Sequence, residues 1–113
     1  MGGPGSEAFL AEVGAIARRA SPPPREELSA ALAAARSSLA LEAPALRPRD
    51  SGELPGGILN LPRLPTAILP DLHARPEFLA AALAWKPPRC AASLAELLES
   101  GEASLVCLGD LFH

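Results

Sequence analysis

The stretch of sequence that decides the fold begins with Thr66-Ala67-Ile68-Leu69-Pro70-Asp71-Leu72-His73 and ends with Ser104-Leu105-Val106-Cys107-Leu108-Gly109-Asp110-Leu111-Phe112-His113. Each segment opens with a short apolar run, which predicts one strand over 67–69 and another over 103–108. The second run does not alternate with polar residues, which is typical of a central strand covered on both faces. Each run stops at side chains that bind divalent cations, namely Asp71 and His73 in the first segment and Asp110 in the second.

Two short helices are predicted between these strands. Pro76 suits the first turn of one helix, whose apolar side carries Phe78, Leu79, Ala82, Leu83 and Trp85. Ser93-Leu94-Ala95-Glu96 has the spacing of a capping box and opens the other helix, which Gly101 ends as its C-cap. Strand, helical crossover and strand make a βαβ unit, with parallel strands and a right-handed connection.

The first 65 residues predict helices and then a break. A helix is expected over 6–20, and a second over 24–41 with a stripe of Leu28, Leu32, Ala35 and Leu39. The Pro- and Gly-rich stretch 44–65 reads as a loop with one short extended piece at 58–61. The predicted organisation is a helical region over 1–43, a linker over 44–65 and an α/β region over 66–113.

The composition of the chain bears on its possible binding partners and on its cellular compartment. The net charge is −3 over 113 residues and no basic run occurs, so nucleic acid is not indicated as a partner, although it stays open as a substrate. No leader peptide is recognised, and no apolar run reaches the roughly 20 residues that span a bilayer, so no membrane association is expected. Cys90 and Cys107 lack metal-site or redox spacing, and Cys107 is expected to be a buried free thiol in a reducing, cytoplasmic protein.

The residues after the two strands are the candidate site. In an open parallel sheet, ligands bind beyond the carboxyl ends of the strands, so Asp71, His73 and Asp110 are expected to converge at one edge. Two carboxylates and an imidazole suit Mn, Fe or Zn, and Gly109 is expected to let the backbone turn sharply there. A second interpretation needs no metal: Asp71 as a turn former or helix N-cap, His73 as a solvated first-turn residue, and Gly109-Asp110 as an ordinary turn.

These two elements resemble the opening of the calcineurin-like metallophosphoesterase family. That family starts with an Asp-x-His element after its first strand, here Asp71-Leu72-His73, and continues with a Gly-Asp element after the next strand, here Gly109-Asp110. The resemblance covers roughly residues 66–113. It implies that Asp71 and His73 bind the first of two divalent ions, that Asp110 bridges both, and that a metal-bridging hydroxide attacks the phosphorus of the substrate.

The later ligands of that family, an Asn-His pair, a further His and a Gly-His-x-His element, have no counterpart here. His113 follows Asp110 at a position that the family often fills with Asp or His, and it is interpreted as a neighbour of the site rather than a ligand. The resemblance therefore implies an incomplete domain, the first βαβ unit of a metallophosphoesterase-type sheet. Its open strand edges are expected to pair with another copy or with a second chain.

Two functions follow from this sequence. The first is the N-terminal part of a metal-dependent hydrolase, a phosphatase or phosphodiesterase acting on phosphate mono- or diesters and inactive by itself unless completed by sequence beyond His113. The alternative is a non-catalytic helical and α/β protein-interaction module, whose amphipathic helices dock on a partner.

Overall fold

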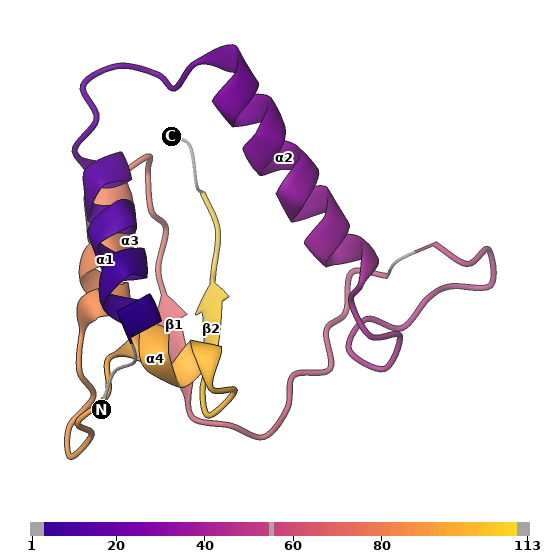
Figure 1. Cartoon of the computed structure of the whole chain (residues 1–113). Coiled ribbons are helices and arrows are strands. Elements are labelled where there is room, and N and C mark those ends of the chain that lie inside the picture. Colours follow the sequence, from indigo (N-terminus) through magenta and orange to yellow (C-terminus); the bar gives the residue numbers. More distant parts are fainter. Residues whose placement is uncertain (1–3, 55, 111–113) are drawn as a thin grey trace. The chain divides into compact units, whose positions relative to one another are not determined.

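The computed structural model of the protein describes residues 4–54 and 56–110. The elements, in chain order, are α1 (Pro4–Ala17), α2 (Arg25–Ala40), β1 (Thr66–Leu69), α3 (Pro76–Ala84), α4 (Leu94–Glu99) and β2 (Ser104–Cys107), as Figure 1 shows. The chain divides into two compact units, one made of Met1–Ala20 with Arg63–His113 and the other of Ser21–Pro62. The protein is therefore a mixed α/β chain with a small sheet, and the predicted class is confirmed at that level.

The sheet pairs β1 with β2 in parallel, as the sequence predicted. Thr66 lies opposite Ser104 and Leu69 lies opposite Cys107, so both strands end at the same rung. The amide of Leu108 donates a further hydrogen bond to the carbonyl of Leu69, 3.0 Å away, and extends the pairing by one step. Because the register is set in this way, the loops that follow both strands leave the sheet at one edge.

The two crossover helices begin where the sequence signals them. Pro76 occupies the start of α3, where its missing N–H costs nothing. Ser93 and Glu96 form the predicted capping box of α4: Ser93 Oγ accepts from the amide of Glu96 at 3.3 Å, and the Ser93 amide donates to Glu96 Oε2 at 2.6 Å. The helix closes at Ser100, and Gly101 follows with φ +73°, the left-handed position that glycine tolerates best.

The core of this unit lies between the helices and one face of the sheet. Its buried apolar side chains are Leu69, Leu72, Leu83, Leu94 and Ala95. Helix α1 packs against α3 and α4, so the first helix belongs with the sheet although the whole of the other unit separates it from β1 in the chain (Figure 1). This grouping follows packing, and it differs from the division at residues 43 and 65, which follows changes in composition.

The other face of the sheet is open, and here the sequence interpretation was wrong. The predicted central strand covered on both faces is one of two strands in the described part of the chain, and its residues are half-buried at most. Ile68 is 62% exposed and Leu108 66% exposed on the side away from the helices. Cys107, predicted to be buried, is an exposed free thiol, although it lies opposite buried Leu69 and therefore on the face that the helices cover, so the helices do not reach across the sheet to this end of β2. A continuous apolar run shows that both faces of a strand could be buried, but it does not show that both are covered. In this unit the helices cover only one face of the sheet.

The second unit consists of α2 and the loop that follows it. No residue of α2 is buried, and the predicted stripe leaves Leu28 48%, Leu32 62% and Leu39 65% exposed. None of the helices in the described part of the chain is both long enough and apolar enough to cross a membrane.

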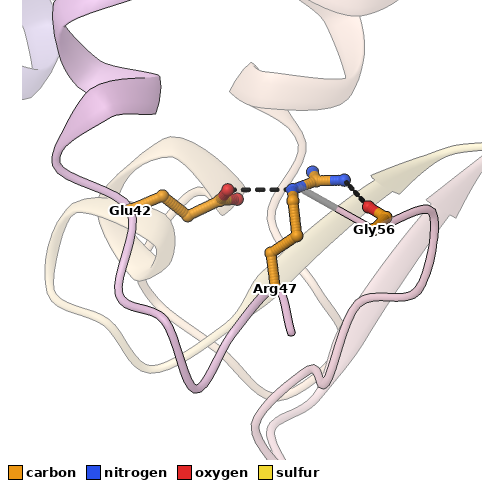
Figure 2. Close-up of polar contacts among 3 residues, drawn as sticks. All are labelled: Glu42, Arg47 and Gly56. Carbon is orange, nitrogen blue, oxygen red and sulfur yellow. Dashed lines mark hydrogen bonds and ion pairs between the residues drawn. The ribbon is translucent and has the colours of Figure 1, made fainter. Parts of the chain in front are cut away.

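The loop after α2 is held by hydrogen bonds, although its composition predicted a linker. Figure 2 shows Arg47 between its two partners: Nε donates to Glu42 Oε2 at 2.9 Å, and the guanidinium also donates to the carbonyl of Gly56 at 3.2 Å. The Gly56 amide in turn donates to the carbonyl of Pro48, and a Cβ on Gly56 would lie 2.8 Å from that oxygen. Residues 58–61 make no strand, so the extended piece predicted there has no ladder partner.

Candidate metal centre

The loops after β1 and β2 are tied together by backbone hydrogen bonds. The amides of Leu72 and His73 both donate to the carbonyl of Asp110, at 3.1 and 2.9 Å. Leu72, 7% exposed, is one of the buried core residues and anchors the first loop to the core. The sequence does not predict this pair of hydrogen bonds, because they join backbone groups of two loops that are far apart in the chain.

The structure brings together the three side chains predicted to converge. His73 Nε2 lies 3.8 Å from Asp71 Oδ2, and His73 Nδ1 lies 3.7 Å from Asp110 Oδ2. The side chains of Asp71 and His73 are about half exposed, at 53% and 50%, while that of Asp110 is 31% exposed. The imidazole therefore stands between two carboxylates that belong to loops 39 positions apart in the chain.

The backbone that presents His73 is in an unusual conformation. His73 and Ala74 have φ of +47° and +54°, two consecutive left-handed residues of which neither is a glycine. A left-handed conformation costs such residues roughly 1–2 kcal/mol each, and strain of this kind clusters at functional sites. The amide of Arg75 donates to the carbonyl of Leu72 at 3.0 Å and closes the turn. The turn is thus held by its hydrogen bonds to Asp110 and by buried Leu72, against its own backbone preference.

The role of Gly109 at this edge of the sheet differs from the predicted one. Its φ is not in the left-handed region, so it does not supply the expected sharp turn. A Cβ at this position would lie 3.3 Å from Asp71 Oδ1, closer than most side-chain contacts. The absent side chain leaves room for the Asp71 carboxylate.

One part of the metal-free interpretation is wrong. The N-cap of α3 is Arg75, with no side-chain capping bond, so Asp71 is not the N-cap of that helix. His73 lies in the turn before α3 and not in its first turn. A metal-free description still fits the geometry. In it, the two loops are joined at the carbonyl of Asp110, and His73 lies between two aspartates as part of an ordinary turn.

As a metal site the arrangement is partial. Two atoms bound to one ion at about 2.1 Å each lie roughly 3.0–4.2 Å apart, so either histidine–carboxylate pair has a separation that an ion can bridge. The two pairs use opposite nitrogens of one ring, however, and within residues 4–54 and 56–110 no group of three or more His, Cys, Asp or Glu side chains is arranged to hold a metal ion. The donor chemistry fits Mn, Fe or Zn, while the geometry offers two pairs of donors in place of one three-donor set.

His113, interpreted from the sequence as a neighbour of the site, lies outside the described residues. Comparisons of the chain with protein-family models, with curated proteins and with solved structures found no match.

Proposed function

We propose that Asp71, His73 and Asp110 are the first ligands of a two-metal phosphoesterase site, carried by the opening βαβ unit of a metallophosphoesterase-type domain. The observation that carries the proposal is the placement of His73, whose two ring nitrogens lie 3.8 and 3.7 Å from carboxylates on the loops after two parallel neighbouring strands. Ligand sites of parallel sheets lie at this edge, and a strained His-containing turn there is costly to keep without a use.

The three side chains have distinct roles in the proposed site. Asp71 and His73 hold one ion, and Asp110, the least exposed of the three, is shared between two. Mn, Fe or Zn, when bound, supplies charge that stabilises phosphate oxygens and activates water. Bringing all three donors to one ion requires the His73 ring to rotate, since its nitrogens now face different carboxylates. The proposed substrates are phosphate mono- or diesters, with nucleic acid open among them, and His113 is the one other histidine in the chain that could add to the ligand set.

A Mn²⁺ titration of the 113-residue protein tests this proposal. The electron paramagnetic resonance signal of aqueous Mn²⁺ disappears on binding, so it measures the free ion directly. We expect weak binding in the native protein and at least about tenfold weaker binding in Asp110→Asn and His73→Ala, which corresponds to about 1.4 kcal/mol. Glu99→Gln is the matched control, because it removes a carboxylate from the end of α4, at the amino end of the strands. Equal Mn²⁺ affinity in all four proteins would end the metal proposal.

A second function is favoured by the exposed stripe of α2. Leu28, Leu32 and Leu39 are about half to two-thirds exposed on a helix with no buried residue, as expected of a module that docks on another protein. The same titration separates the two functions, since an interaction module predicts no Mn²⁺ binding that depends on Asp110. For either function we propose a reducing, cytoplasmic setting, which the two free thiols Cys90 and Cys107 support.

A further inference from the structure

A pocket of about 400 Å³ lies at the end of the sheet opposite the candidate metal centre. It is formed where the chain enters β1 and β2 and where α3 turns into α4. The residues that shape it are Trp85, Pro87, Cys90, Leu94, Leu97 and Glu102. Its volume is within the range of roughly 300–1,000 Å³ that small-molecule sites occupy.

The walls of the pocket are apolar and fixed by main-chain hydrogen bonds. The amide of Leu94 donates to the carbonyl of Trp85 at 2.8 Å, which joins the end of α3 to the start of α4. The amide of Cys90 donates to the carbonyl of Pro87 at 3.0 Å and closes the turn between them. Leu94 is buried beneath, while Trp85 stays 50% exposed although it lines a pocket. A large aromatic ring that stays half exposed while its backbone is fixed by hydrogen bonds is typical of a binding surface.

The charged side chain that lines the pocket indicates which kind of ligand the pocket favours. Among the described residues that line it, Glu102 is the one that carries charge. Its main-chain amide donates to the carbonyl of Leu97 at 2.8 Å, and its Oε2 accepts from Ser100 Oγ at 3.1 Å, so both its backbone and its carboxylate are held by hydrogen bonds. A carboxylate and an exposed indole that line the same pocket can both attract a cation, one through its charge and the other through its ring face.

We propose that this pocket binds a small organic cation, an apolar body carrying one ammonium group. The body occupies the space between Trp85 and Leu97, and the ammonium group lies toward Glu102. The site is independent of the proposed phosphoester chemistry, since it shares no residue with Asp71, His73 and Asp110.

The chain provides two built-in reporters for a test. Trp85 is its single tryptophan, so intrinsic indole fluorescence comes from the pocket alone. Cys90 lines the pocket, whereas Cys107 is exposed at the far end of β2, so alkylation of the two thiols by iodoacetamide compares a covered position with an internal reference. The probes are phenethylammonium and its uncharged N-acetyl derivative, which share the same aromatic body.

We expect phenethylammonium to change Trp85 fluorescence saturably and to slow alkylation of Cys90 without affecting Cys107. The N-acetyl derivative should bind about three- to tenfold more weakly, the difference that a partly exposed cation–π and ion-pair contact supplies. Glu102→Gln should reduce that difference to the part that the Trp85 ring supplies, while the matched variant Glu99→Gln, with the same change in net charge, should keep it in full. Equal binding of the two probes to the native protein, or a fluorescence change without protection of Cys90, would overturn the proposal.

Discussion

Ser6 of α1 and Glu96 of α4 are joined by a hydrogen bond of 3.3 Å from Ser6 Oγ to Glu96 Oε1, across 90 positions of the chain. The other carboxylate oxygen of Glu96 accepts from Ser93, at 2.6 Å from its amide and 2.8 Å from its hydroxyl. Ser6 and Ser93 are 4% and 3% exposed. The Glu96 carboxylate therefore has two roles: it completes the capping box of α4, and it links α4 to α1 through Ser6.

The stability of this unit is expected to fall in acid. Hydrogen bonds from the backbone and then the side chain of Ser93, with help from Ser6 and the charge of Lys86, lower the pKa of Glu96 below its ordinary value of 4.5. A carboxyl group with a lower pKa in the folded state stabilises that state when ionised. Its contribution is complete above about pH 4.5 and is lost as the pH falls through the folded-state pKa. Urea unfolding at several values between about pH 3 and pH 7 measures this loss.

Glu96→Gln is the variant that isolates the effect. Its unfolding midpoint should change less between about pH 5 and pH 3 than that of the native protein, whereas Glu99→Gln should follow the native curve. Parallel curves for the native protein and Glu96→Gln would contradict the role given to this carboxylate.

Gly101→Ala is expected to destabilise the protein by about 1 kcal/mol. Gly101 has φ +73°, a conformation that costs an alanine roughly 1–2 kcal/mol, partly offset because alanine loses less backbone entropy on folding. Apart from its chain neighbours, no atom of the described residues lies within 4 Å of the Cβ that the change would add, so the backbone alone sets the cost. Urea unfolding at neutral pH gives the difference, and an alanine variant as stable as the native protein would show that the turn relaxes freely.

Ala74→Gly should act in the opposite direction. The left-handed φ of +54° at Ala74 is relieved by glycine, which should raise the free energy of unfolding by up to about 1 kcal/mol. If the turn is kept strained so that it presents His73, the same variant should bind Mn²⁺ less tightly despite its greater stability. A destabilised Ala74→Gly protein would mean that this turn carries no strain.

The open face of the sheet predicts self-association. Ile68 and Leu108 expose apolar side chains on a sheet whose two strands each have one unpaired edge in the described part of the chain. We expect sedimentation velocity to show oligomers that dissociate on dilution, and Ile68→Lys to shift the protein to monomer because a charge on that face blocks its burial. Leu41→Lys changes another exposed apolar residue, outside the sheet, and serves as the control. A native protein that is monomeric at all concentrations would contradict the prediction.

Local signals in the sequence predicted the local structure. Ser93 and Glu96 act within four residues, and Pro76 fixes its own φ, so the starts of α4 and α3 follow from the residues themselves. The pairing of β1 with β2 followed from the helical crossover between them. The convergence of Asp71, His73 and Asp110 then followed from that pairing.

What the sequence did not reveal depends on contacts between distant residues. An amphipathic pattern says that α1 has an apolar side, but not that Ser6 meets Glu96 or that α3 and α4 are its neighbours. The exposure of Cys107, whose strand partner Leu69 is buried, depends on how far across the sheet the helices reach, which no run of apolar residues records. The left-handed turn at His73 and Ala74 is set by the Asp110 carbonyl and opposes local preference, so propensities point away from it.

The bond between Ser6 and Glu96 also has a consequence for synthesis on the ribosome. At about 5–20 residues per second, the residue that secures α1 is made roughly 5–20 s after α1 itself. A helix of 14 residues is marginal in water when alone, so until α3 has been made its apolar side lacks the helix that it packs against in this unit. The unit that contains the sheet cannot close until α4 and β2 have emerged as well, and the nascent protein depends during that time on whatever else in the cell covers an exposed apolar helix.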